Sequence, residues 1–435
     1  MHKAIIVTDL GFGDSGKGTI VDFLSKHYNA HTVVKHNGGA QAAHRVVLPD
    51  GVTHVFNQFG AGTFHGAKTI ISRYALFDPR LLAIEADNLS TKGVKNPLSL
   101  ISVDEKTVVV TVYHKILNRL REISRGKQAH GSCGLGIGET MQDLHHFPNE
   151  TIFAKDLKDK QILVNKLNRI HARKFSEAQR FGIYNNQEYY KFFIDKELIN
   201  LVTNNFLELG EKIKILPSNA LYEKFDNGVV IFEGSQGVLL DEYNGFHPYT
   251  TWSTTTKRNA IFVLEEMLFK GKIENIGVIR AYATRHGNGP FPTEDVALTN
   301  LLPDVSNAFN DWQRNFRIGW LDFVLLRYAL EVNGGVSSLA VTNLDRMDEV
   351  VKKGTQLKIC NQYDAINDLH KIKASDDSNF LDTIYKKLTE PLFKANPIYT
   401  NIKEDELISV IEERLKNKIS IISRGQSYLD KVLLG

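Results

Sequence analysis

The chain is poor in cysteine, nearly balanced in charge and without long apolar runs. Its two cysteines, Cys133 and Cys360, cannot build a disulfide framework, which favours a reducing compartment. The 53 Lys and Arg against 50 Asp and Glu leave a net charge of +3, which argues against a nucleic-acid polymer or a membrane surface as partner. No apolar run is long enough to span a bilayer, and no signal-peptide pattern opens the sequence. We therefore expect a soluble cytoplasmic protein.

The length and apolar content indicate a large folded core. The 435 residues are 42% hydrophobic, enough for one large α/β domain or two smaller ones. There is no internal repeat, no low-complexity segment and no linker rich in Pro or Ser. Residues 155–225 are charged, have few glycines and predict a helical insertion packed on a sheet.

The most informative stretch is the glycine-rich segment GFGDSGKG at residues 11–18. It follows the apolar, β-branched residues 4–8 and precedes a helical pattern. A strand, a glycine loop and a helix in this order point backbone N–H groups at a phosphate. Gly13 and Gly16 allow the tight turn, and Lys17 adds a positive charge for the outer phosphates.

The loop differs from an ordinary P-loop at one position. Gly18 stands where a P-loop has the Ser or Thr whose hydroxyl holds Mg²⁺. Asp14, inside the loop, can hold the metal instead and can also accept a proton. The alternative is an ordinary glycine-rich turn between a strand and a helix without a ligand.

This loop resembles the one that opens the adenylosuccinate synthetases, whose usual form is GDEGKG. Further similar segments follow in the family's order at residues 1–60, 130–140, 228–295, 317–346 and 419–426. The resemblance implies a single α/β domain over residues 1–435, with a large and mainly parallel central sheet. It also implies a homodimer.

The resemblance assigns Asp14, Lys17 and His44 to catalysis. In the implied reaction, Asp14 removes the N1 proton of a 6-oxopurine nucleotide, such as inosine monophosphate, so that O6 attacks the γ-phosphate of GTP. The amine of L-aspartate then displaces the phosphate, which gives adenylosuccinate, GDP and phosphate. Mg²⁺ is the implied cofactor and Asp14 its implied protein ligand.

For the nucleoside triphosphate, the resemblance implies binding by Gly13, Gly16, Lys17, Gly18, Asp345, Ser423 and Gly425. Asp345 follows the apolar run 339–342, and its carboxylate can accept hydrogen bonds from guanine N1–H and the 2-amino group. Adenine offers neither donor in that arrangement, so we expect GTP, with ATP as the alternative.

For the acceptor nucleotide, the implied contacts are Gln41, Ser132, Cys133, Gln236 and Thr251. Ser132 and Cys133 replace two threonines of the family, and a thiol is a poorer hydrogen-bond donor to phosphate than a hydroxyl.

Two further departures concern the other substrate contacts. The family's interface Arg is missing from residues 143–148, where His145 or His146 is a candidate substitute. Arg314 matches the Arg that grips the amino acid's carboxylate, but Asp311 and Trp312 replace threonines there, and Phe316 replaces an Arg that contacts the triphosphate.

These departures leave three readings open. The first is adenylosuccinate synthesis from inosine monophosphate and aspartate. The second is the same phosphoryl-activation chemistry on a different purine nucleotide such as dGMP, or with a different amino acid, or with ATP in place of GTP. The third is a nucleotide-binding protein without catalytic activity. The retention of Asp14, Lys17, His44, Gln236 and Arg314 argues against the third.

Overall fold

The centre of the protein is a ten-stranded sheet, seen in a computed structural model that describes residues 2–126, 131–222, 228–304, 316–366, 368–372 and 380–434. The strand order is β19-β18-β15-β11-β1-β10-β2-β5-β7-β9. All neighbours pair in parallel except β19, which runs antiparallel to β18. In chain order, the strands are β1 (Lys3–Asp9), β2 (Thr32–Lys35), β5 (Lys68–Ile71), β7 (Ile101–Asp104), β9 (Lys214–Leu216), β10 (Val229–Glu233), β11 (Lys272–Arg280), β15 (Ser338–Thr342), β18 (Ile419–Ser423) and β19 (Lys431–Leu433). This confirms the predicted α/β fold with a large, mainly parallel sheet.

Four small sheets surround the central one. Their strands are β3 (His44–Val47) with β4 (Thr53–Phe56), β6 (Leu76–Phe77) with β8 (Val108–Val109), β12 (Ala283–His286) with β13 (Phe316–Gly319), and β14 (Leu321–Asp322) with β16 (Leu357–Tyr363) and β17 (Pro397–Ile402). The hairpin β3–β4 packs against the first helix and brings His44 to the glycine loop.

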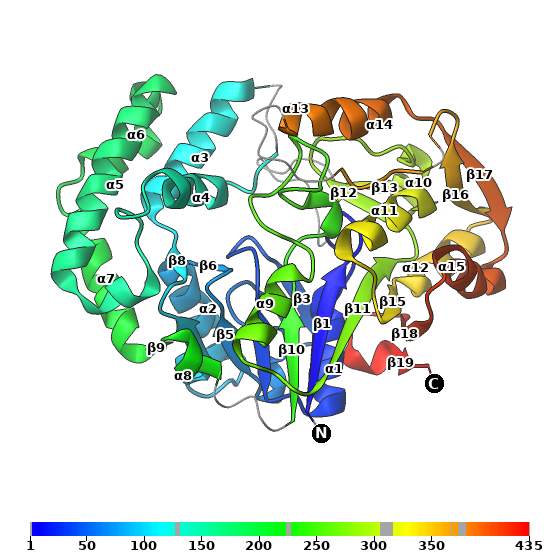
Figure 1. Ribbon diagram of the computed structural model, residues 1–435, viewed down its shortest axis with the longest axis horizontal. Coiled ribbons are helices and arrows are strands. Elements are labelled where there is room, and N and C mark those ends of the chain that lie inside the picture. The colour runs from blue at the N-terminus through cyan, green and yellow to red at the C-terminus, as the bar shows by residue number, and fades with distance from the viewer. Residues whose placement is uncertain are drawn as a thin grey trace.

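Helices cover both faces of the sheet (Figure 1). They are α1 (Lys17–Tyr28), α2 (Pro79–Thr91), α3 (Val112–Arg125), α4 (Ile137–His146), α5 (Lys160–Arg180), α6 (Gln187–Ile194), α7 (Leu198–Lys212), α8 (Ser218–Tyr222), α9 (Arg258–Glu266), α10 (Val296–Leu301), α11 (Phe323–Asn333), α12 (Leu344–Lys352), α13 (Phe380–Ile384), α14 (Glu390–Lys394) and α15 (Leu407–Leu415). Within the described ranges, none is long and apolar enough to cross a membrane.

The first strand explains why both faces need covering. All seven residues of β1 are buried, and their side chains alternate between two cores. Ile5 and Val7 belong to the core that includes α1, whereas Ala4 and Ile6 pack in the core formed with α9. A continuous run of apolar residues is therefore what a central strand of this sheet requires.

Three segments show strands that sequence periodicity does not delimit. Residues 278–285 belong to two strands, because β11 ends at Arg280 and β12 leaves the central sheet to pair with β13. The strands β7 and β8 lie within residues 80–125, and β16 and β17 lie within residues 350–415. Periodicity alone does not show where a chain leaves one sheet for another.

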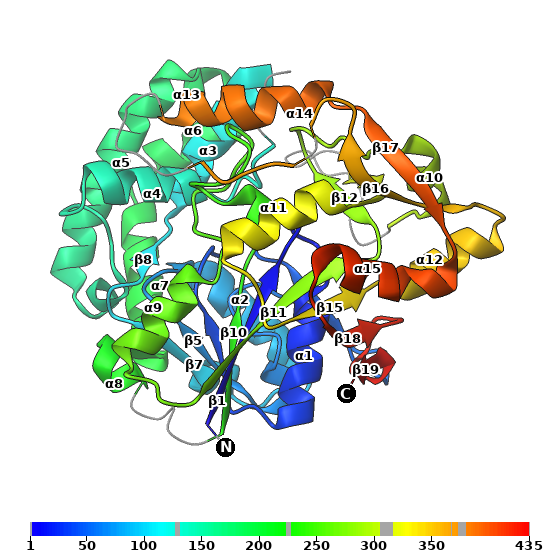
Figure 2. The same cartoon turned by 45° about the vertical axis from the view of Figure 1, so that its right-hand side comes forward.

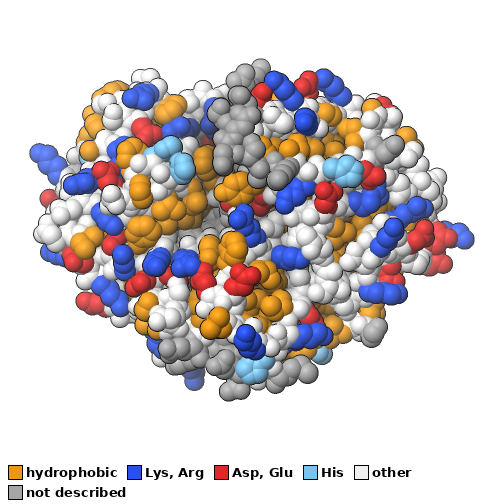
Figure 3. Space-filling view, in the orientation of Figure 1, with side chains coloured by type: hydrophobic (Ala, Val, Ile, Leu, Met, Phe, Trp, Pro, Cys, Tyr) orange, Lys and Arg blue, Asp and Glu red, His pale blue; other side chains and the backbone are white. Residues whose placement is uncertain are grey.

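The described part of the segment 155–225 is helical as expected, with α5 to α8, but it also supplies a strand. Within this segment, β9 pairs in parallel with β7 and forms one edge of the central sheet. The helices α5, α6 and α7 lie at the side of the molecule remote from α15, as Figures 1 and 2 show. On the face seen in Figure 3, acidic and basic side chains are interspersed, in keeping with the balanced charge.

The packing of the core predicts how much the free energy of unfolding falls when a buried side chain is shortened. Replacing Ile6 by Ala removes a fully buried side chain between β1 and α9 and should lower the free energy of unfolding by about 2–5 kcal/mol. Ile273, in the neighbouring β11, is 42% exposed, so Ile273→Ala is the matched control and should cost much less. Urea denaturation of both variants measures the difference. Equal losses would contradict the assignment of Ile6 to the core.

Candidate active site

The glycine loop connects β1 to α1 at the carboxyl end of the sheet, where parallel α/β folds bind ligands. Gly13 and Gly16 have φ values of 95° and 88°, and Asp14, although not glycine, has φ 58°. A Cβ at Gly18 would lie 2.7 Å from the Cβ of His44. Because β3 approaches the helix this closely, Gly18 cannot be the Ser or Thr of a P-loop.

A buried carboxylate holds the loop from below. Asp9, the last residue of β1, accepts hydrogen bonds from the backbone N–H of Gly11 (2.8 Å) and Ser15 (3.0 Å). It also accepts one from the Ser15 hydroxyl (2.8 Å) and pairs with the ammonium of Lys17 (2.9 Å). Sequence reasoning missed Asp9, although a charged residue at the end of an apolar strand and just before a glycine loop was a usable signal.

Asp14 stands at the rim of the loop and is one-third exposed, at 34% of its side-chain surface. Its Oδ2 pairs with Nδ1 of His286 at 2.9 Å, and its carbonyl oxygen accepts a hydrogen bond from Nε of Arg280 at 2.5 Å. Burial alone would raise the pKa of the Asp14 carboxyl, but the hydrogen bond from His286 and the charges of Arg280 and Lys17 outweigh it and lower that pKa. Asp14 is thus ionised at neutral pH, as both a base and a metal ligand must be.

His44 is oriented by a second buried carboxylate. Its Nδ1 contacts Oε1 of Glu233, the last residue of β10. Glu233 is also bound by the ammonium of Lys35 (3.4 Å) and the backbone N–H of Ala61 (2.9 Å). Burial opposes ionisation of Glu233, yet Lys35 and His44 lower its pKa to about 2. With Nδ1 engaged, Nε2 is the nitrogen of His44 that remains for a ligand.

Burial has the opposite consequence for the imidazole itself. It lowers the pKa of His44 more than the neighbouring Glu233 carboxylate raises it. The His44 ring is therefore neutral at pH 7, with a proton on Nδ1 directed at Glu233. Nε2 can then accept a hydrogen bond, and it becomes a donor only when the ring gains a proton.

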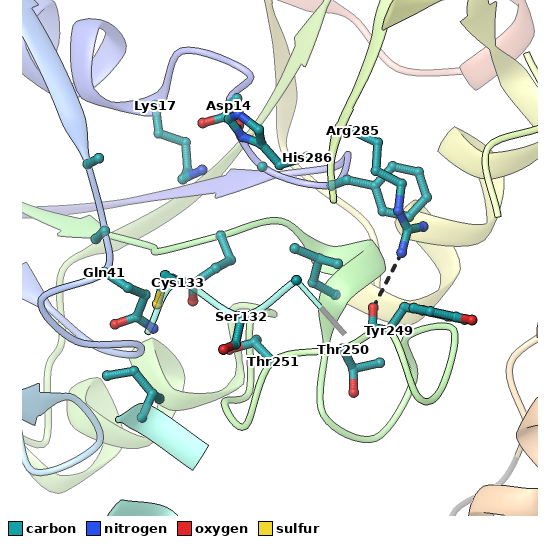
Figure 4. Close-up of a pocket in the computed structure, with 18 of the residues that line it drawn as sticks. Asp14, Lys17, Gln41, Ser132, Cys133, Tyr249, Thr250, Thr251, Arg285 and His286 are labelled. Atoms are coloured by element: carbon teal, nitrogen blue, oxygen red, sulfur yellow. Dashed lines mark hydrogen bonds and ion pairs between the residues drawn. The ribbon is translucent and has the colours of Figure 1, made fainter. Parts of the chain in front are cut away.

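One cavity of about 1600 Å³ collects the predicted site residues (Figure 4). It is lined by Gly13, Asp14, Gly16, Lys17, Gly18, Gln41, His44, Ser132, Cys133, Gln236, Thr251, Asp345, Ser423 and Gly425. In Figure 4, Asp14, Lys17 and His286 face Gln41, Ser132, Cys133 and Thr251 across the cavity. Arg314 lies outside the described residues.

Two amides in this cavity have polar atoms directed at no protein partner among the described residues. Both polar atoms of the Gln41 side chain are buried without a hydrogen-bond partner among the described residues, and so is Oε1 of Gln236. Gln236 also has φ 55°, a backbone conformation rare for a residue with a side chain. Buried amides without partners are costly, so these groups are suited to a polar molecule that fills the cavity.

The loop at Ser132 is held by α3. The Ser132 hydroxyl and amide are bound by Asn118 (3.1 Å) and Glu122 (3.3 Å) respectively. Glu122 also binds the N–H of Gly131 at 2.9 Å and pairs with Arg125 at 2.6 Å. Arg125 lines the cavity, as do His145 and His146, the residues suggested as substitutes for the missing Arg. Burial raises the pKa of the Cys133 thiol, so it stays protonated.

At the far end of the cavity, Asp345 lies in the first turn of α12, and burial raises the pKa of its carboxyl. Ser423 ends β18, and its hydroxyl donates to the carbonyl oxygen of Gly425 (3.2 Å). Lys431 donates to the same carbonyl at 3.0 Å. These two contacts fix the shape of the turn, and Asp345, Ser423 and Gly425 all line the cavity.

Comparison with known proteins decides the family. A family model described as adenylosuccinate synthetase matches residues 6–431. The chain belongs to the adenylosuccinate synthetase family. It is 32% identical to the adenylosuccinate synthetase of Wigglesworthia glossinidia brevipalpis over 456 aligned positions, covering 100% of this chain and 99% of that one. With that of Desulforapulum autotrophicum it shares 30% identity, covering 98% and 93%. Adenylosuccinate synthetases are C–N bond-forming ligases, so this family member is an enzyme of that class.

Solved structures of adenylosuccinate synthetases share the fold. The fully ligated adenylosuccinate synthetase of Plasmodium falciparum superposes with a TM-score of 0.80 at 21% identity, covering 99% of both chains. The succinoaminodeoxyadenylate synthetase PurZ of cyanophage S-2L, solved with dGMP and with dATP as an energy donor, superposes with a TM-score of 0.61 at 13% identity. That match covers 100% of this chain and 95% of the phage enzyme.

The buried pair of Glu233 and His44 yields a prediction. Glu233→Gln keeps the shape but removes the charge that fixes the imidazole, so kcat should fall about 10²-fold or more. Steady-state phosphate release measures kcat, and circular dichroism checks the fold. Glu242→Gln, which alters another carboxylate lining the cavity, is the matched control and should have a smaller effect. Unchanged kcat in Glu233→Gln would remove this pair from the mechanism.

Proposed function

We propose that this protein joins a 6-oxopurine nucleotide to the amine of L-aspartate at the expense of GTP, giving adenylosuccinate, GDP and phosphate. The observation that carries the proposal is the shared cavity, which Asp14, Lys17 and His44 line together with Gln41 and Gln236. Both polar side-chain atoms of Gln41 and Oε1 of Gln236 have no hydrogen-bond partner among the described residues. Family membership indicates the class of reaction, and the residues of the cavity include the base and the phosphate-binding groups that this reaction needs.

In the first step, the Asp14 carboxylate accepts the N1 proton of the purine, and O6 attacks the γ-phosphorus of GTP. The O6–P bond forms as the bond from that phosphorus to the β–γ bridging oxygen breaks. Lys17 balances the charge on the phosphates, and Nε2 of His44, once the ring has gained a proton, donates a hydrogen bond to the transferring phosphoryl group. The Asp9 carboxylate holds the Lys17 ammonium in place, and the Glu233 carboxylate orients the His44 imidazole.

In the second step, the amine of aspartate attacks C6, the C6–O bond breaks and inorganic phosphate leaves. The amine nitrogen loses its protons to solvent or to the departing phosphate. Arg314 is proposed to grip the carboxylate of the amino acid, since a guanidinium binds a carboxylate through two parallel hydrogen bonds.

The site suits a magnesium ion bound mainly by substrate. No group of three or more His, Cys, Asp or Glu in the described part of the chain forms a ready metal site. Mg²⁺ is commonly held by one carboxylate together with nucleotide phosphates and water, and Asp14, next to Lys17, offers that carboxylate. Bound there, the ion would supply positive charge to the phosphates. We also propose that the enzyme acts as a cytoplasmic homodimer.

A second candidate is the same chemistry on a different acceptor, such as dGMP, or with ATP or another amino acid. Ser132 and Cys133 stand at the two threonine positions, and residues 143–148 contain no Arg. The phage enzyme that was solved with dGMP and dATP has the same fold. The two sequence departures concern the residues proposed to bind the acceptor nucleotide.

A substrate matrix tests these alternatives. The purified protein is incubated with Mg²⁺, GTP or ATP, inosine monophosphate or dGMP, and each of a panel of amino acids, and phosphate release is followed. Release that needs GTP, inosine monophosphate and aspartate together supports the first proposal. Release only with another combination, with the product identified by mass spectrometry, supports the second. No release with any combination contradicts catalysis.

Asp14 gives the sharpest single-residue prediction. Asp14→Ala should lower kcat by about 10²–10⁴-fold or more, because it removes the base that creates the O6 nucleophile. Binding of GTP should survive, since the loop amides and Lys17 remain. Single-turnover phosphate release and calorimetric titration with GTP measure the two quantities. Near-wild-type turnover in this variant would exclude Asp14 as the base.

A further inference from the structure

Asp9 is the most heavily engaged side chain beneath the glycine loop. It is 1% exposed, and each of its oxygens accepts two hydrogen bonds. Oδ1 is bound by the N–H of Gly11 and the hydroxyl of Ser15, and Oδ2 by the N–H of Ser15 and the ammonium of Lys17. All four donors belong to the loop or to the first turn of α1, so one carboxylate ties together both ends of the loop.

The pair of Asp9 and Lys17 is secluded from water. The Lys17 side chain is 3% exposed and that of Asp9 is fully buried, at an N–O distance of 2.9 Å. A charge in such surroundings is stable only when it is paired. An ammonium has three protons, and Asp9 engages one of them, which leaves the others for ligand oxygens. The carboxylate therefore fixes the direction in which Lys17 presents its free protons.

Ser15 is part of the same arrangement. In the family's usual loop, GDEGKG, a glutamate follows the aspartate, whereas this chain has Ser15. Here the Ser15 hydroxyl donates to Asp9 at 2.8 Å. Position 15 therefore supplies a hydroxyl that binds Asp9 in this chain, where the family's usual loop has a carboxylate.

We propose that Asp9 is a positioning residue for triphosphate binding, which acts through Lys17 and Ser15 and does not touch the substrate itself. It holds the loop in the shape that binds phosphate and directs the Lys17 ammonium toward the triphosphate. This inference rests on the proposed function, because it assumes that the loop binds the triphosphate.

Asp9→Asn is the informative substitution, because it keeps the size of the side chain and exchanges one acceptor oxygen for a donor. That NH₂ group opposes the donors of Ser15 and Lys17 and leaves the ammonium without its counter-charge. The affinity for GTP with Mg²⁺ should fall about 10–100-fold, the usual range for a lost hydrogen bond to a charged group. The affinity for inosine monophosphate should stay unchanged.

A double-mutant cycle separates positioning from general support of the fold. If Asp9 acts through Lys17, then Asp9→Asn should cause little further loss of GTP affinity in a Lys17→Gln background. Calorimetric titration of the wild type, both single variants and the double variant measures the coupling. Ser15→Ala removes a single bond to Asp9 and should weaken GTP binding about threefold to tenfold. If Asp9→Asn does not fold, the GTP affinity of Ser15→Ala tests the inference in its place.

Three results would overturn the inference. The first is wild-type GTP affinity in Asp9→Asn, or in Ser15→Ala if Asp9→Asn does not fold. The second is an equal loss of affinity for GTP and for inosine monophosphate, and the third is a loss of GTP affinity in the double variant equal to the product of the two single losses. Failure of the wild type to bind GTP or ATP would instead refute the proposed function, and the inference with it. If the wild type binds the triphosphate and Asp9→Asn binds it equally well, the role of Asp9 is refuted but the proposed function is not.

Discussion

Two buried carboxylates at the ends of neighbouring strands support the whole site. Asp9 ends β1, Glu233 ends β10, and these strands pair in parallel in the middle of the sheet. Asp9 neutralises the Lys17 ammonium, whereas Glu233 neutralises the Lys35 ammonium and orients the neutral imidazole of His44. Without these acids, the buried cations would carry a large desolvation cost, and the sheet could not present them to a ligand.

Asp14 differs from these two carboxylates in its exposure and in its hydrogen-bond partners. Asp9 and Glu233 have their oxygens occupied by donors from the protein, whereas Asp14 is partly exposed and keeps Oδ1 free of any described contact. Its left-handed backbone carries it out of the loop, and Arg280 holds the carbonyl of the same residue. Three acids of similar intrinsic chemistry therefore serve two purposes. Two are structural counter-charges, and one is available for proton transfer or a metal.

Much of this arrangement follows from sequence reasoning. The apolar run 4–8, the glycine loop and the helical pattern after it predict β1, the loop and α1, because local periodicity and glycine content determine them. Asp9 and Glu233 were missed because their importance depends on partners that the fold brings near. Glu233 lies 189 residues from His44, and no local pattern predicts that contact. The same holds for His286, 272 residues from Asp14.

Gly18 shows how tertiary structure explains a departure that sequence reasoning could only record. A P-loop residue with a hydroxyl is excluded there because the Cβ and backbone of His44 occupy the space. The close approach of β3 leaves no room for a hydroxyl side chain at position 18. The same approach brings the His44 imidazole to the loop, so one packing contact accounts for both features. The packing at Gly18 is therefore consistent with the proposal that Asp14 supplies the carboxylate for a metal.

The departures from the family's pattern divide the cavity in a way that bears on substrate choice. On the side of the proposed phosphoryl transfer, Lys17 and His44 are held by the buried carboxylates of Asp9 and Glu233, and Asp14 pairs with His286. On the acceptor side, Ser132 and Gly131 have their amides bound by Glu122, a residue that also occupies Arg125. Under the proposed function, an acceptor phosphate at this loop would meet donors that an internal carboxylate already binds. The residues proposed for the first half-reaction are thus held from the sheet, whereas the loop proposed for the acceptor is held from α3.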